Sequence, residues 1–151
     1  LLLPALKSNE EPTAASTPIP APSEDRASQA SVLIMDDEEI ILRVSEHMLK
    51  ALGHHPDLAV SGSQALELYT ARYKAGNPID VVILDVNVPN GMGGVETAAA
   101  IHAFDPRAKI VLCSGYYQES FERAELPKGV SATLTKPFLM ESLKNTLLEL
   151  L

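Results

Sequence analysis

Short apolar runs alternate along the chain with longer segments in which apolar residues recur every three or four positions. Runs of four or five residues rich in Val, Ile and Leu are typical of strands buried on both faces of a parallel sheet. Such strands are predicted at Val32–Met35, Val81–Leu84, Lys109–Cys113 and Val130–Leu134. A weaker run, His55–Val60, has Pro56 near its start, and this predicts an edge strand.

Helical periodicity fills the intervals between the strands. The predicted helices run from about Glu38 to Leu52 with a stop at Gly53, and over Ser63–Lys74, Val95–Phe104, Gln118–Glu125 and Met140–Leu150. The predicted inward faces are Ile41, Val44, Met48 and Leu52 in the first helix and Ala65, Leu66, Leu68 and Tyr69 in the second. No two-residue hairpin turn separates successive strands, so we expect an α/β fold: a doubly wound parallel sheet with helices on both faces.

The segment before Ser31 has a different character. Residues 7–31 hold four prolines among Ala, Ser, Thr and Glu, and such a composition predicts a disordered linker. The opening LLLPAL lacks a basic start and a cleavage site, so it is not a signal peptide. Because the first residue is Leu, we expect the sequence to be a piece of a longer protein.

Composition narrows the class of protein. A chain of 151 residues with 46% hydrophobic and 21% charged residues suits one soluble domain with a sizeable core. Its formal net charge of -8 argues against a nucleic-acid surface and favours a cation or a basic partner. A single cysteine, Cys113, excludes an intrachain disulfide and fits a reducing, cytoplasmic compartment. No apolar run approaches the roughly 20 residues of a membrane span, so no membrane contact by this segment is expected.

Polar side chains follow the predicted strands at their C-terminal ends. Asp36 and Asp37 follow the first strand, Asp85 the third, Ser114 the fourth and Lys136 the fifth. In a parallel sheet of order 2-1-3-4-5 these groups share one edge. Three carboxylates at close range repel one another unless a cation intervenes, and hard oxygen ligands suit Mg²⁺.

This combination of groups favours phosphoryl transfer. Asp85 can attack phosphorus, while Mg²⁺ and Lys136 neutralise the equatorial oxygens and Ser114 donates a hydrogen bond. Each group alone has an ordinary role: an Asp-Asp pair caps a helix, Lys-Pro is a solvated turn and Ser-Gly is a loop. Their joint occurrence at successive strand ends favours the chemical interpretation.

From Val32 to Leu151 the sequence resembles the receiver domain of two-component response regulators. The motifs that carry the resemblance are LIMDDE, VVILDVNVP, VLCSG and TLTKPF. The resemblance implies a flavodoxin-like (βα)5 fold and phosphorylation of Asp85 by a phosphohistidine. It assigns Mg²⁺ to Asp37, Asp85 and the backbone carbonyl of Asn87, with Asp36 acting through water. It also makes Ser114 and Lys136 ligands of the phosphoryl oxygens and Pro137 a cis-proline.

Three positions depart from the family pattern. The loop NGMGG after Pro89 is one residue longer than the family's commonest form. Thr133 stands where the family often has a Tyr or Phe that turns inward on activation, which leaves Tyr116 or Tyr117 as substitutes. Gly115 stands where Ala is commoner, which loosens access to the acyl phosphate.

The resemblance is greatest to receivers at the C-terminus of hybrid sensor histidine kinases. SGYYQ and KPF carry it, and residues 1–6 resemble the last strand of a kinase ATP-binding domain, followed by the linker. The implied partners are a histidine kinase, in cis or in trans, and a histidine phosphotransfer protein, with switching of the region after the fourth strand. The exposed face of the last helix is one through which this family commonly dimerises or docks.

Other functions fit the residues less well. A receiver used only for docking would retain the fold, and Thr133 keeps that alternative open. A haloacid-dehalogenase-type phosphatase also uses Asp, Ser/Thr, Lys and Mg²⁺, but it needs a second acid two residues after the nucleophile, where this chain has Asn87. A flavin-binding domain would need a phosphate loop after the first strand, and none follows Met35.

Overall fold

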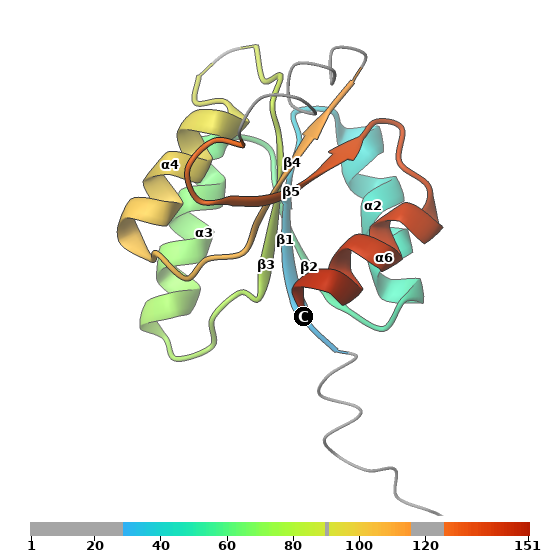
Figure 1. Cartoon of the computed structure of the whole chain (residues 1–151), viewed down its shortest axis with the longest axis horizontal. Helices are drawn as coiled ribbons and strands as arrows, with labels where there is room; N and C mark the ends of the chain where they lie inside the picture. The colour runs from blue at the N-terminus through green and yellow to red at the C-terminus, as the bar shows by residue number, and fades with distance from the viewer. Residues whose placement is uncertain (1–28, 90, 116–125) are drawn as a thin grey trace, which may run out of the picture.

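Five parallel strands form a single sheet in the computed structural model, which describes residues 29–89, 91–115 and 126–151. The sheet order is β2-β1-β3-β4-β5, so the predicted fold class and strand order are confirmed (Figure 1). The strands are β1 (Ser31–Met35), β2 (His55–Ala59), β3 (Val81–Asp85), β4 (Ile110–Ser114) and β5 (Val130–Thr135). β3 lies at the centre, and all five of its residues are buried.

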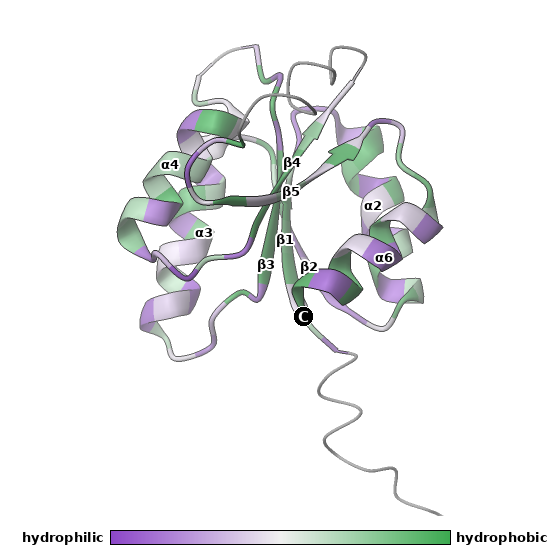
Figure 2. Ribbon diagram, in the orientation of Figure 1, coloured by the Kyte–Doolittle hydropathy of each residue, from purple (hydrophilic) through white to green (hydrophobic). Residues whose placement is uncertain are grey.

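Helices cover both faces of the sheet. Figure 1 shows α2 (Glu39–Ala51) and α6 (Met140–Leu150) on one face, and α3 (Gly62–Lys74) and α4 (Gly94–Phe104) on the other. Successive strand residues point to opposite faces, so Val32 and Ile34 join one core cluster while Leu33 and Met35 join the other. Figure 2 shows the resulting concentration of hydrophobic residues along the strands.

α3 begins immediately after β2 because two side chains cap its start. The Ser61 hydroxyl accepts a hydrogen bond from the backbone N–H of Gln64 at 3.2 Å. The Gln64 side-chain oxygen in turn accepts one from the N–H of Val60 at 2.7 Å. These bonds satisfy backbone donors that a helix start would otherwise leave free.

The inward face of α2 differs from the prediction. Its buried residues are Leu42, Ser45 and Leu49, whereas Val44 is 48% exposed. The predicted set of inward residues and the observed buried set both have the spacing of three and four residues that marks a helix face. Periodicity alone could therefore not decide between them. The prediction is wrong for Val44, while Met48 and Leu52 pack at the margin of the core.

The chain enters β1 at the sheet edge opposite to the C-terminal ends of the strands. The N–H of Ala30 donates to Nδ1 of His54 at 3.0 Å, and the N–H of Ser31 donates to Oδ2 of Asp80 at 2.8 Å. The C-terminus, Leu151, lies at the same end of the sheet as the start of β1 (Figure 1).

Several sequence predictions fall outside the described residues. They are the kinase-like segment 1–6, the linker up to residue 28, the helix predicted over 118–125, and the residues Tyr116 and Tyr117. Within the described part of the chain, no helix combines the length and the apolar character that a membrane span requires.

Candidate functional site

The sheet register brings the predicted site residues to one edge. Met35 pairs with Leu84, so Asp36 and Asp85 follow at the same level on neighbouring strands. Ser114 is the last residue of β4 and pairs with Thr135 at the end of β5. The backbone N–H of Lys136 then donates to the carbonyl of Ser114 at 2.7 Å, which fixes where the lysine leaves the sheet.

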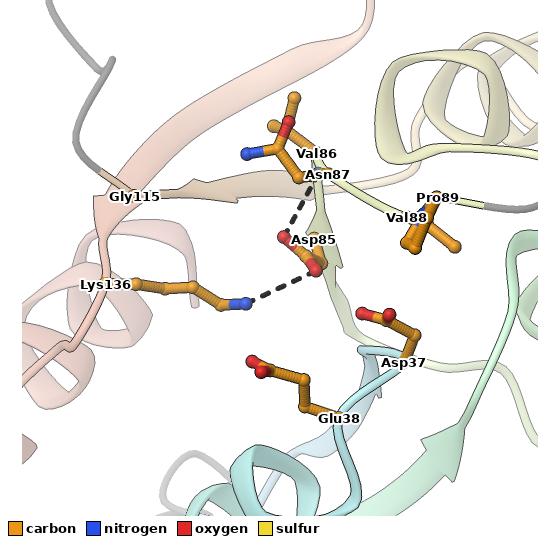
Figure 3. A pocket seen from close by; sticks show the side chains of 9 residues that line it. All are labelled: Asp37, Glu38, Asp85, Val86, Asn87, Val88, Pro89, Gly115 and Lys136. Atoms are coloured by element: carbon orange, nitrogen blue, oxygen red, sulfur yellow. Dashed lines mark hydrogen bonds and ion pairs between the residues drawn. The ribbon is translucent and has the colours of Figure 1, made fainter.

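Lys136 contacts two buried carboxylates. Its Nζ lies 2.5 Å from Oδ2 of Asp36 and 3.3 Å from Oδ2 of Asp85. Figure 3 shows the lysine, which follows β5, extending toward Asp85 on the central strand β3, with β4 lying between β3 and β5 in the sheet. Asp36 is 2% exposed and Asp85 is 3% exposed, so both charges depend on the few groups around them.

The protonation of this group of charges is coupled. Burial raises the pKa of Asp85, and the negative charge of Asp36 raises it further. Lys136 and the N–H of Asn87 act in the opposite direction but do not cancel the shift. Burial would lower the pKa of Lys136, but its hydrogen bonds to Asp36 and Asp85 and the charges of both outweigh burial and raise that pKa. An additional cation beside Asp85 would therefore favour the ionised carboxylate.

Backbone donors orient the two buried carboxylates. Oδ1 of Asp85 accepts a hydrogen bond from the N–H of Asn87 at 3.2 Å, which is drawn in Figure 3. Oδ1 of Asp36 accepts one from the N–H of Glu38 at 2.9 Å. Each carboxylate is thus held by the turn that follows its own strand.

The acidic residues fit a hard divalent cation. Ligand atoms of Asp36, Asp37 and Asp85 all lie within 4.8 Å of one another. Asp37 is exposed and opens this cluster to a cavity of about 590 Å³. The lining of the cavity is Asp37, Glu38, Asp85, Val86, Asn87, Val88, Pro89, Gly115 and Lys136 (Figure 3). Mg²⁺ prefers carboxylate ligands and keeps several waters, and an open cavity leaves room for those waters.

The other predicted residues lie around this cavity or next to it. Ser114 is buried at the end of β4, and Gly115 lines the cavity with open space where a Cβ would be. Thr133 is half-buried on β5, opposite Leu112. The Lys136–Pro137 peptide bond is cis.

Some lining residues were not identified from the sequence. Glu38, Val86 and Val88 also line the cavity. The available signal was their position one to three residues after the aspartates at the strand ends. The sequence assigned Glu38 only to a helix start.

An apolar groove adjoins the cavity. It measures about 310 Å³ and lies between α2 and the segment after β5. Ile40, Ile41, Val44, Ser45, Met48, Lys136, Pro137 and Phe138 line it. Lys136 lines both the groove and the acidic cavity, and Ile40 beside Glu38 is 70% exposed.

Comparison with known families gives a match over most of the chain. Residues 32–148 match the model of the response regulator receiver domain. Among curated proteins, the sensor kinase CckA of Brucella abortus is 28% identical over 145 residues, which cover 96% of this chain and 15% of that protein. The chemotaxis protein CheY of Halobacterium salinarum is 29% identical over 80% of this chain and 95% of its own. The chain thus spans only a small part of the kinase but nearly all of the CheY.

Solved structures give the same likeness. The response regulator TrrA of Thermotoga maritima, in complex with Mg²⁺ and BeF, is 31% identical with a TM-score of 0.66, covering 81% of this chain and 99% of that chain. The CheX-CheY-BeF3-Mg²⁺ complex of Borrelia burgdorferi includes a chain that is 26% identical with a TM-score of 0.71, covering 80% of this chain and 87% of that one.

Proposed function

The chain belongs to the response regulator receiver domain family of two-component signalling, and from this premise we propose that Asp85 accepts a phosphoryl group from a phosphohistidine. The observation that carries the proposal is the position of Asp85 at the end of the central strand. There its carboxylate lies 3.3 Å from the ammonium of Lys136 and within 4.8 Å of the carboxylates of Asp36 and Asp37. One nucleophile, one fixed cation and two further anionic ligands thus meet at the rim of an open cavity.

The reaction is a displacement at phosphorus. A carboxylate oxygen of Asp85 forms the new P–O bond as the P–N bond to the donor imidazole breaks, and the departing nitrogen keeps the electron pair. Lys136 faces the oxygens that carry the developing charge, and the hydroxyl of Ser114 donates to one of them. The hydrogen bond from the N–H of Asn87 holds the nucleophile in one orientation.

We propose Mg²⁺ as the cofactor, held by Asp37, Asp85 and the carbonyl of Asn87, with Asp36 acting through water. When bound, the ion neutralises charge on the phosphoryl oxygens. The three clustered carboxylates and the raised pKa of Asp85, caused by burial and by Asp36, support this assignment. Two related structures hold Mg²⁺ together with BeF3 or BeF, which supports Mg²⁺ as the choice of metal.

The deciding experiment is intact mass spectrometry after incubation with acetyl phosphate and Mg²⁺. We expect a gain of one phosphoryl group, about 80 Da, that is absent in Asp85→Asn and absent when Mg²⁺ is chelated. An adduct that persists in Asp85→Asn would place the acceptor elsewhere. Absence of an adduct while calorimetry shows Mg²⁺ binding would instead favour a receiver used only for docking.

The phosphatase alternative is tested in the same samples. Its chemistry needs an acid two residues after the nucleophile, and Asn87 occupies that position. We therefore expect no sustained release of phosphate from small phosphate esters. Multiple turnovers would revive the phosphatase and contradict the acceptor role.

We also propose that the donor protein docks across the apolar groove, so that its phosphohistidine reaches Asp85 past Lys136. The exposure of Ile40 and Val44 supports this, because apolar side chains of that size gain by being covered. Ile40→Ser should slow phosphorylation by the donor kinase or phosphotransfer protein. It should leave labelling by acetyl phosphate unchanged, because a small donor needs no protein contact.

A matched control uses Leu148 on α6, which is 65% exposed and does not line the groove. Leu148→Ser should leave transfer from the protein donor unchanged. Equal slowing by both variants would contradict docking at the groove. A loss of acetyl phosphate labelling in Ile40→Ser would point to damage at the acceptor site instead.

We further propose that the domain follows a kinase ATP-binding domain and a linker in a longer polypeptide. The alignment with the Brucella sensor kinase supports this, because it covers 96% of the chain and therefore reaches upstream of Val32. An antibody to residues 32–151 should detect an endogenous polypeptide far larger than 16.2 kDa in cell extracts. An endogenous polypeptide of about 16.2 kDa would contradict the proposal.

A further inference from the structure

The first turn of α4 lies directly on the main chain of Asp85. A methyl group built on Gly94 would overlap the carbonyl oxygen of Asp85 and lie 2.9 Å from its carbonyl carbon and 3.1 Å from Cα of Val86. All three neighbours are backbone atoms, so no change of side-chain rotamer can relieve the overlap. Gly94 is buried, and only the absence of its Cβ allows the helix this close to the strand end.

The Asp85–Val86 peptide group, which Gly94 contacts, is also held from the side of β4. The N–H of Val86 donates to the carbonyl of Cys113 on β4 at 2.9 Å. The Asp85–Val86 peptide is therefore enclosed between a neighbouring strand and the helix start. Displacing it would stretch this hydrogen bond and move the side chain of Asp85 with it.

α4 itself has little room to retreat. Thr97, which is fully buried, donates through both its N–H and its hydroxyl to the carbonyl of Gly93, at 2.9 and 2.7 Å. A methyl group on Gly62 of α3 would overlap the Thr97 hydroxyl and lie 2.6 Å from the carbonyl oxygen of Met92. Because α3 closes the outer side of the helix start, extra volume at Gly94 has to be absorbed by the strand end.

We infer that Gly94 is a positioning residue for the phosphoacceptor, an inference that rests on the proposed function. Its close contact sets where the Asp85–Asn87 segment lies. This segment carries the nucleophile, the N–H that orients it at 3.2 Å and the carbonyl of Asn87 assigned to Mg²⁺. A methyl group at Gly94 shifts all three relative to Lys136 and Asp36, which are held by other strands.

The test compares two tightly packed glycines. Gly94→Ala and Gly62→Ala should both lower the urea midpoint of unfolding, since each adds a methyl group where there is no space. Only Gly94→Ala should weaken Mg²⁺ binding by calorimetry and slow acetyl phosphate labelling, each by about tenfold or more, because reacting groups tolerate little displacement. Gly62→Ala should stay within about twofold of the natural protein in both, since its contacts do not include Asp85.

One further variant keeps the test decisive. Gly93→Ala puts a methyl group 3.2 Å from the carbonyl oxygen of Val86 and should give a smaller loss of the same kind, which answers the question if Gly94→Ala fails to fold. Natural Mg²⁺ affinity and labelling rate in folded Gly94→Ala, or an equal loss in Gly62→Ala, would overturn the inference.

A structural readout separates this inference from the proposed function. In Gly94→Ala the amide NMR resonances of Val86 and Asn87 should move more than in Gly62→Ala. That comparison needs neither phosphate nor metal. If the natural protein forms no adduct, the proposed function fails while the positioning role is still decided by these shifts.

Discussion

The ammonium nitrogen of Lys136 lies 2.5 Å from Oδ2 of Asp36, closer than the 3.3 Å that separates it from Asp85. Without a metal, the lysine is thus the positive charge that keeps two buried carboxylates together. A divalent ion bound to Asp85 would compete with the lysine for that carboxylate. Under the proposed function, Lys136 would have two opposing tasks: balancing the charge of the metal-free site and holding the phosphoryl group.

Replacing this lysine should separate those tasks. Lys136→Met keeps much of the apolar stem and removes the charge, so Mg²⁺ should bind several-fold more tightly in calorimetry, since a fixed positive charge close to the cation site is gone. Acetyl phosphate labelling should fall by at least tenfold, because no fixed cation faces the transferred oxygens. Weaker Mg²⁺ binding would show that the lysine supports the metal site rather than competes with it.

The corrected face of α2 makes a direct stability prediction. Leu49→Ala removes a fully buried side chain and should lower the free energy of unfolding by about 2–5 kcal/mol. Val44→Ala truncates a half-exposed side chain on the groove and should cost below about 0.5 kcal/mol. Urea unfolding of the two variants checks this, and equal losses would restore the face predicted from periodicity.

A hydrogen bond joins α3 to the turn after α4. The hydroxyl of Tyr69 donates to Oδ2 of Asp105 at 2.7 Å, and the Tyr69 ring packs edge-on against Phe104. Tyr69→Phe keeps the ring and should cost about 1 kcal/mol, the net value of one hydrogen bond. Tyr73→Phe, at a half-exposed ring that also packs on Phe104, is the matched control and should leave the urea midpoint unchanged.

Ionisation of the Cys113 thiol should lower the free energy of unfolding of the domain at high pH. Burial raises the pKa of its thiol to about 12, with the charges of Asp85 and Asp36 adding to the shift and Lys136 opposing it. Because the folded-state pKa is above the unfolded value of about 8.5–9, the protonated thiol stabilises the fold fully below pH ~9, and this is lost as pH rises toward ~12.

The measurement compares the natural protein with Cys113→Ala by urea unfolding at pH 7.5 and pH 10.5. The natural protein should lose about 2 kcal/mol more than the variant between these two values. Other groups titrate in both proteins and cancel in the difference. Parallel losses would mean that the thiol ionises as easily in the folded protein as in the unfolded chain.

The sheet was predictable because its signal is local. The side chains of β3 by themselves predict a buried strand. Parallel strands necessarily bring their C-terminal ends to one edge of the sheet. That rule alone places Asp36, Asp85 and Ser114 together, as the register does. The face of α2 was not predictable, since Ser45 is buried and Val44 is exposed, against the preference of each side chain.

The details of the site depend on contacts that sequence spacing does not encode. Nothing near Gly94 in the chain signals that its Cα lies on the peptide of Asp85, since that contact arises only when α4 packs on the sheet. The pairing of Lys136 with Asp36 was also not predicted. The sequence suggested only that the lysine would face a phosphoryl group.

Both ends of the described chain lie at the sheet edge away from the acidic cavity. The entry is fixed there by His54 and Asp80, and Leu151 closes α6 at the same end. Neighbouring sequence can therefore be attached before or after the domain without passing over the edge that carries the acidic cavity. Evolution can join such a domain to many different proteins, because fusion at either terminus leaves the same surface free for a visiting partner.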